Sequence, residues 1–226
     1  EFLPISSSGH LTMLQHFFGI EGDSILIFTI LMHVGTLAAV FIIYWNDIWA
    51  LIKELFVTIY DLVTFKGLKL KERPVRKLGV MIIIASIPTA IIGLGLEDVF
   101  ESFYHSLIPT GVGLLLTGVL LWIAESKPKK KGKGIEDMTW AHAVIIGTMQ
   151  GAAITPGISR SGSTLFGGLI TGLDRDFAVE FAFLISIPSV LGSLVLESGS
   201  DAMASIISTN MGPIIVGFIC SLVSGI

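Results

Sequence analysis

Long stretches without Asp, Glu, Lys or Arg are the feature that most limits how this chain can fold. They cover residues 2–20, 24–46, 78–96, 102–124, 181–196 and 202–226. A helix needs about 20 mostly apolar residues to cross a bilayer, and several stretches are that long. Strands of a membrane barrel would instead alternate apolar and polar residues. Charged residues make up only 14% of the chain, too few to cover a soluble globule. The sequence therefore predicts an all-α, polytopic integral membrane protein whose single membrane domain covers residues 1–226.

The basic residues predict the topology. Eleven of the 14 Lys and Arg residues lie in two short segments, 66–77 and 127–133. Basic loops stay on the cytoplasmic side, so both segments should be cytoplasmic. Segments 78–96 and 107–124 then run out and back, with an acidic turn at 97–106 outside. A lipid-headgroup site is a less favoured explanation of the lysine run. Segment 48–65 carries three charges, so it either spans inside the bundle or lies at the interface.

The chain repeats itself at an offset of 153 residues. Ser6, Ser8 and Gly9 align with Ser159, Ser161 and Gly162. Each copy has a Ser/Gly break, about ten apolar residues, an acidic turn and a full-length span. Ten residues are too few to cross, so we expect re-entrant half-helices at 11–20 and 165–173.

The two copies cover about 1–96 and 138–226. If 48–65 spans, an odd number of crossings separates them and gives inverted-topology repeats, which place a site where the copies meet. Both chain ends are expected to be truncated, because residue 1 is Glu and residues 220–226 stop inside an apolar run.

Arg160 is the only charged residue in 138–173. An Arg at bilayer depth costs at least about 2.5–3.5 kcal/mol, so it needs a reason to be there. It could pair with a buried carboxylate and only hold helices together. Its neighbours favour another role, because Ser159, Ser161 and Thr164 add hydroxyl groups and Gly162 opens a helix N-terminus. Guanidinium, hydroxyl and amide donors around one point predict a phosphate cradle.

The first break has the same frame with different chemistry. Ser6, Ser7 and Ser8 again precede a Gly, and Glu1 and His10 flank the turn. Glu, Ser and His together can move a proton and attack phosphorus, although the serines could simply cap a helix. The other histidines lack metal-ligand spacing and are expected to be packing or interface residues, namely His16, His33, His105 and His142.

These two breaks carry a resemblance to a known family. EFLPISSSGHL at 1–11 and TPGISRSGST at 155–164 resemble the two signature motifs of the undecaprenyl-diphosphate phosphatase family of the bacitracin-resistance type. The resemblance covers essentially the whole chain. It implies an inverted-repeat helical membrane fold and removal of the terminal phosphate of undecaprenyl diphosphate at the outer face. This reaction recycles the lipid carrier for peptidoglycan synthesis, and it implies dependence on Mg²⁺ or Ca²⁺.

The resemblance also implies residue roles. Arg160 would clamp the diphosphate and Glu1 would hold the metal. Either Ser7 attacks with His10 as its base, or His10 attacks or activates water while Ser7 only donates a hydrogen bond. The family has a further acidic residue four positions before Glu1, and Gln150 occupies the matching position of the second copy, which indicates a polar partner there. The remaining substrate-binding positions are Ser6, Ser159, Ser161, Gly162 and Thr164.

Partners and location follow from the same features. We expect a polyprenyl diphosphate substrate, surrounding membrane lipids, no nucleic acid and a homodimer as the candidate assembly. The location would be the inner (plasma) membrane, with the active site facing outward. The alternative function is a transporter or flippase for an anionic phospholipid, since half-helices around an anion also occur in transporters. A carrier would have no need of Glu1, Ser7 and His10 as a reactive set.

Overall fold

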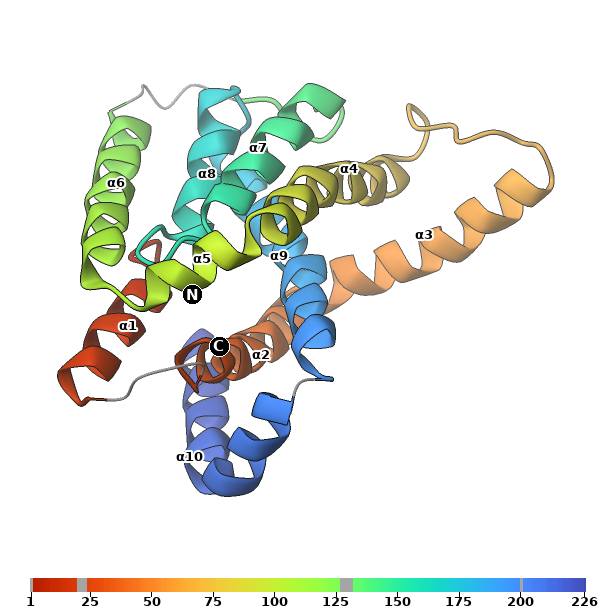
Figure 1. The fold of residues 1–226 in the computed structure, drawn as a ribbon. Helices are drawn as coiled ribbons and strands as arrows, with labels where there is room; N and C mark the ends of the chain where they lie inside the picture. The colour runs from red at the N-terminus through yellow and green to blue at the C-terminus, as the bar shows by residue number, and fades with distance from the viewer. Residues whose placement is uncertain (1, 20–23, 127–131, 200) are drawn as a thin grey trace.

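The computed structural model describes residues 2–19, 24–126, 132–199 and 201–226. These residues form ten helices and one isolated β-bridge, between Lys133 and Leu173 (Figure 1). The helices are α1 (Ser7–Phe17), α2 (Ser24–Ile43), α3 (Trp45–Val63), α4 (Pro74–Gly95), α5 (Glu97–Tyr104), α6 (Leu107–Glu125), α7 (Trp140–Ala152), α8 (Arg160–Ile170), α9 (Arg175–Glu197) and α10 (Asp201–Gly225).

Four helices are long and apolar enough to cross a membrane: α4, α6, α9 and the 203–225 part of α10. Helices α2 and α3 pass the same test only as a pair bent by 84°. This confirms the prediction of an all-helical, multi-pass membrane protein. Segment 48–65 was expected either to span inside the bundle or to lie at the interface. It belongs to α3, which extends outward from the bundle in Figure 1.

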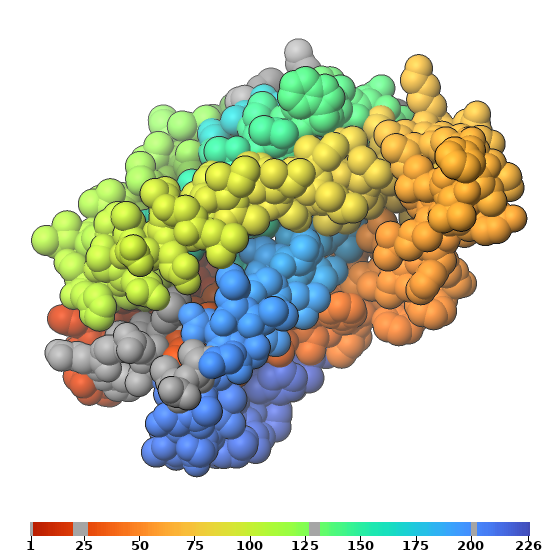
Figure 2. All heavy atoms as spheres, turned by 45° about the vertical axis from the view of Figure 1, so that its right-hand side comes forward, coloured from red at the N-terminus to blue at the C-terminus, as the bar shows by residue number. Residues whose placement is uncertain are grey.

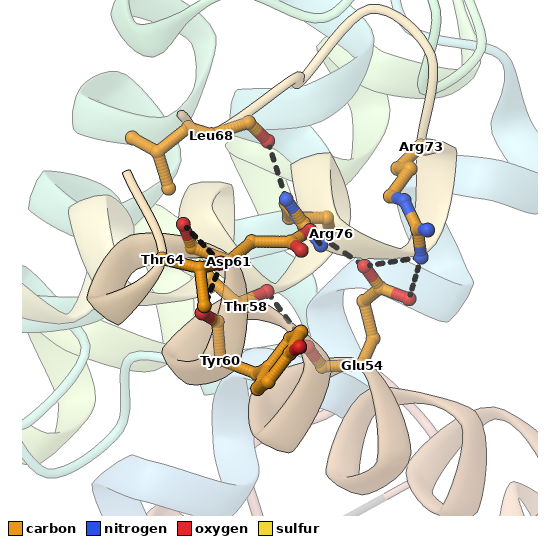
Figure 3. Close-up of polar contacts among 8 residues, drawn as sticks. All are labelled: Glu54, Thr58, Tyr60, Asp61, Thr64, Leu68, Arg73 and Arg76. Atoms are coloured by element: carbon orange, nitrogen blue, oxygen red, sulfur yellow. Dashed lines mark hydrogen bonds and ion pairs between the residues drawn. The ribbon is translucent and has the colours of Figure 1, made fainter. Parts of the chain in front are cut away.

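A buried ion-pair cluster explains how α3 accommodates its charges (Figure 3). Arg76, at the start of α4, is only 2% exposed. Its Nε donates to Glu54 Oε1 at 2.8 Å, and its Nη2 donates to Asp61 Oδ2 at 2.7 Å. The third nitrogen, Nη1, donates to the Leu68 carbonyl at 2.9 Å, and Arg73 adds a second contact to Glu54. Part of the 66–77 basic segment therefore neutralises the carboxylates of α3 and attaches α3 to α4.

Helix α4 is central to the packing. It lies mainly against α7, and Figure 2 shows α4 and α5 crossing one face with α7 above and α9 below. The helices touch at Gly147, where an added Cβ would stand 1.9 Å from the Ala85 carbonyl oxygen. Only a glycine allows this approach.

The two ends of α4 differ in charge. At the first end, Lys77 Nζ donates to the Glu136 carbonyl at 2.7 Å, so the segments around both basic runs meet there. Residues 127–131 of the second run lie outside the described residues. Twenty-two helical residues extend about 33 Å, so α5 begins at the opposite end. The acidic turn expected at 97–106 is wrong in part, because 97–104 is helical. Glu97 and Asp98 suit its N-terminus and Phe100 is buried.

His142 contacts the loop before α7 through Thr139 and Lys133. Its Nδ1 accepts a hydrogen bond from the Thr139 backbone N–H at 3.0 Å, so the proton of the neutral ring is on Nε2. Lys133 Nζ lies 3.4 Å from that Nε2. Burial, followed by the charge of Lys133, lowers the pKa of His142 below its ordinary value. The fold thus favours the neutral imidazole.

Acidification should therefore destabilise this corner. The unfolded chain binds a proton on His142 near its usual pKa of about 6.5, which the native state resists, so stability should fall as the pH drops from 7 to 5. Thermal melting in detergent across this range measures the effect. A His142→Gln variant should lose part of the pH dependence, whereas the exposed His105→Gln should keep it. Equal pH profiles for His142→Gln and the parent protein would contradict the assignment.

Candidate active site

The two sequence breaks share a serine cap, although the backbone of Ser6 is left-handed (φ 62°) and that of Ser159 is extended (φ −71°). Ser6 Oγ accepts a hydrogen bond from Gly9 N at 3.2 Å, and Ser159 Oγ accepts one from Gly162 N at 3.1 Å. Each cap starts a helix of 11 residues, α1 or α8. These helices begin earlier than the expected 11–20 and 165–173, because a serine caps each first turn. The offset of 153 residues is thus repeated in the cap hydrogen bonds and in the length of the two helices.

The two breaks also touch each other. A Cβ on Gly9 would stand 2.9 Å from Gly157 Cα, and one on Gly162 would stand 3.3 Å from Pro4 Cβ. Thr117 of α6 holds the second break, since its Oγ1 donates to the Gly157 carbonyl at 3.0 Å and accepts from Ser159 N at 2.9 Å. Residues about 150 positions apart in the chain are therefore brought to one place.

A cavity of about 300 Å³ lies at this meeting point. Both breaks contribute to its wall, through Ser6–Ser8 and Ser159–Ser161, and helices α2, α4, α5, α7 and α9 supply the rest. Apolar side chains such as Ile30, Ile154 and Leu94 share the wall with these polar groups. The exposed carboxylates Glu97 and Glu101 lie on the α5 side. The cavity therefore offers polar and apolar surface together, as an amphiphilic ligand requires.

Arg160 is the one Arg or Lys residue among the described residues that line the cavity. It begins α8, lines the cavity and makes no salt bridge with any described residue. Its Nη1 is buried and has no hydrogen-bond partner in the described part of the chain. A guanidinium used only to hold helices together would have a carboxylate beside it. An unpaired donor at a helix N-terminus instead suits a phosphate.

The predicted nucleophile and base are placed differently. Ser7 lines the cavity, whereas His10 is exposed and is not among the lining residues. His10 Nδ1 lies 2.8 Å from the Ser6 carbonyl oxygen. A carbonyl only accepts, so Nδ1 carries the proton and Nε2 keeps the lone pair that a base needs.

The other predicted residues fall into three groups. Ser6, Ser159 and Ser161 line the cavity. Gly162 and Thr164 are buried in α8 behind the lining, and Thr164 Oγ1 donates to the Arg160 carbonyl at 2.9 Å. Glu1, the predicted metal ligand, lies outside the described residues.

Several polar residues that motif analysis did not assign as ligands also line the cavity, among them His33, Gln150 and Thr89. His33 of α2 was expected to be a packing residue, but it lines the cavity with Nδ1 2.7 Å from the Thr29 carbonyl. Gln150 of α7 and Thr89 of α4 are also there. The repeat offset of 153 residues does indicate Gln150, because it places this residue at the position that matches the family's further acidic residue. A single histidine or threonine in an apolar span gives no such signal.

The described residues do not by themselves fit a divalent cation. No three Asp, Glu, His or Cys side chains in the described ranges gather closely enough to hold one. The expected Mg²⁺ or Ca²⁺ and its ligand Glu1 therefore stay predictions, and the chemistry below uses only side chains that the structure describes.

Comparison with known proteins agrees with this geometry. The family model of the bacitracin resistance protein BacA matches residues 1–226. An undecaprenyl-diphosphatase of Alkaliphilus metalliredigens is 49% identical over 226 residues, which is 100% of this chain and 82% of that protein. The undecaprenyl-diphosphatases of Carboxydothermus hydrogenoformans and Methanosphaera stadtmanae are 40% and 38% identical, covering 100% of this chain and 79% and 80% of theirs. The family model over residues 1–226, together with relatives up to 49% identical over the whole chain, shows that this chain belongs to the BacA family of bacitracin resistance proteins.

Proposed function

We propose that this protein hydrolyses undecaprenyl diphosphate to undecaprenyl phosphate and inorganic phosphate. The observation that carries the proposal is Arg160, which lines the cavity with the serines of both half-helix breaks and whose buried Nη1 has no hydrogen-bond partner among the described residues. The names of the relatives support the same substrate. The reaction would recycle the lipid carrier for peptidoglycan synthesis and confer bacitracin resistance. No observation favours the transporter alternative.

The cavity suggests how the substrate would bind. Arg160 would hold the diphosphate, because phosphoryl transfer depends mainly on positioning and charge neutralisation. Hydroxyl groups of Ser6, Ser159 and Ser161 would donate to phosphate oxygens, and the prenyl chain would lie against the apolar wall. Gly162 and Thr164 would support this cradle from inside α8.

The activity is tested with purified protein in detergent and undecaprenyl diphosphate, with Mg²⁺ or Ca²⁺ supplied. We expect release of inorganic phosphate that depends on protein concentration. A chelator should stop it if the predicted cation is required. If the protein releases no phosphate but moves the lipid across a liposome bilayer, the phosphatase proposal fails and the transporter is correct.

The nucleophile is proposed to be Ser7. Acid quenching during turnover should trap phosphate on Ser7, and peptide mapping would locate it. A label on His10, or no label at all, would overturn the assignment in favour of direct attack by His10 or by water. His33 also lines the cavity. Comparing the activities of the single variants His33→Gln and His10→Ala would therefore identify which imidazole serves as the base, because the loss of the base should cost more activity.

The proposed location is the plasma membrane, with the cavity opening outward. The support is the order of charges along α4, whose first end meets the basic segments while α5, at its other end, lines the cavity. Basic loops stay in the cytoplasm, so the α5 end would face outside. A homodimer remains a candidate assembly that a mass measurement in detergent would decide.

A further inference from the structure

Gln150 is the most deeply buried polar side chain that lines the cavity without an assigned role. It lies near the end of α7, just before the second break, and is 1% exposed. Its Nε2 donates to Thr89 Oγ1 of α4 at 3.3 Å and to the Ile185 carbonyl of α9 at 3.4 Å. Its Oε1 is buried and has no partner among the described residues. One amide therefore bridges three helices and leaves a single atom unsatisfied.

The contacts fix which end of the amide is unsatisfied. A carbonyl such as that of Ile185 can only accept a hydrogen bond, so the group facing it must be the nitrogen. Thr89 Oγ1 already donates to the Gly147 carbonyl at 2.8 Å, and so it accepts from Gln150. Both amide protons are used by the scaffold. Gln150 and Arg160 both line the cavity, and the atom that lacks a partner among the described residues is an acceptor in Gln150 and a donor in Arg160.

An acceptor does not suit a phosphate oxygen, because two acceptors repel unless a proton lies between them. It suits an O–H group. Buried polar atoms without a protein partner commonly hold an ordered water, and hydrolysis must bring one water oxygen to phosphorus. We propose that Gln150 Oε1 binds and orients the water that is consumed in the reaction. This inference rests on the proposed phosphatase function and adds a water-positioning residue to it.

The proposed step balances in either route of attack. The water oxygen forms a new bond to phosphorus. The bond from phosphorus to the leaving oxygen breaks, and its electron pair stays on that oxygen, which belongs to the lipid monophosphate or to Ser7. One water proton passes to the histidine base. Gln150 takes no proton and only accepts a hydrogen bond, so its role is orientation.

The chain offers a matched control. Gln15 of α1 is also buried, at 7% exposure, and its Oε1 is also unpartnered among the described residues, but it does not line the cavity. Gln150→Ala should lower kcat for phosphate release by about 10- to 100-fold with KM changed less than about twofold, since misplaced reactants lose about this much rate. Gln15→Ala should leave both constants near those of the parent protein.

Other outcomes would overturn the proposal. A raised KM with unchanged kcat would make Gln150 a substrate ligand. Recovery of Gln150→Ala at high Mg²⁺ or Ca²⁺ would make it a metal ligand. Equal losses in Gln150→Ala and Gln15→Ala would reduce it to packing. If Gln150→Ala fails to fold, Thr89→Val removes the hydroxyl that holds the amide, together with its hydrogen bond to the Gly147 carbonyl. Thr89→Val should lower kcat, whereas Thr89→Ser, which keeps a hydroxyl, should have a kcat near that of the parent protein. Equal kcat values for Thr89→Val and Thr89→Ser would overturn the proposal.

A measurement without turnover separates this inference from the function itself. A high-resolution density map of the wild-type protein without substrate should show an ordered water within about 3.2 Å of Gln150 Oε1. A dry site, or a cation there, would overturn the inference even if phosphate release is intact. If the water is present but no phosphate is released, the proposed function fails and the water site stands.

Discussion

Replacing Arg160 by alanine should lower phosphate release from undecaprenyl diphosphate by about 10³-fold or more. Charged donors that act on the transferred phosphoryl group are worth this much in other phosphoryl-transfer enzymes. Arg160 lines the cavity, and its Nη1 has no hydrogen-bond partner among the described residues. Arg160→Lys should recover only part of the loss, because an ammonium group cannot make the two parallel bonds of a guanidinium. Initial rates in detergent with saturating substrate measure the effect.

The same substitution should not destabilise the fold. Arg160 makes no ion pair with a described residue, and a buried donor without a partner costs stability rather than adding it. The Tm of the Arg160→Ala variant should therefore match or slightly exceed that of the parent protein. Arg175→Ala is the matched control, because Arg175 pairs with Glu125 at an exposed position outside the cavity. If Arg160→Ala lowers the Tm but keeps the activity of the parent protein, the role of Arg160 is purely structural.

Replacing Gly157 by alanine should disrupt the second break. Gly157 has a φ of +91°, and a Cβ there would lie 2.1 Å from the Thr110 carbonyl oxygen. Left-handed strain costs about 1–2 kcal/mol and overpacking costs about 1–3 kcal/mol more. The break would have to move away from α6, and a shift of about 1 Å at the cradle can cost about 10²-fold in rate. We expect a strongly lowered Tm and phosphate release reduced at least about 100-fold.

Gly172→Ala separates the strain of a left-handed backbone from the clash of an added Cβ with a neighbouring helix. Gly172 has nearly the same φ, +89°, but nothing lies within 4 Å of its Cβ position. It should therefore show the strain alone, with a small drop in Tm and activity within about twofold of the parent protein, since its backbone need not shift. If both variants lose the same stability and activity, close packing of the break on α6 has no part in shaping the site.

The local structure of the breaks could be predicted from sequence, although their helix starts could not. Ser6 to Gly9 and Ser159 to Gly162 are contacts over three residues, so they depend mostly on neighbouring sequence. The expected half-helices began several residues late, because the capping serines were treated as part of the break. The sequence indicates a turn at 97–104 because these eight residues, of which three are acidic and three are aromatic, have no clear apolar period.

The candidate site could be predicted only in part. Arg160 and the serines were identified because a charge or a dense hydroxyl cluster in an apolar run is visible without a fold. His33 was not, since its approach to the cavity depends on how α2 packs. His10 follows the break in sequence but lies outside the lining, because successive helical residues point in different directions.

A multi-pass helical membrane protein with two matching breaks and a charged Arg160 inside an apolar run is predictable from sequence, because apolar length and charge position are properties of continuous segments. Which polar groups share the cavity depends on how the helices pack. Gln150 meets Thr89 and Ile185 across separations of 61 and 35 residues, and the buried Arg76 joins Glu54 and Asp61 between two helices. Such contacts depend on the close packing of α4, α7 and α9, where a glycine or a kink sets distances that no local pattern encodes.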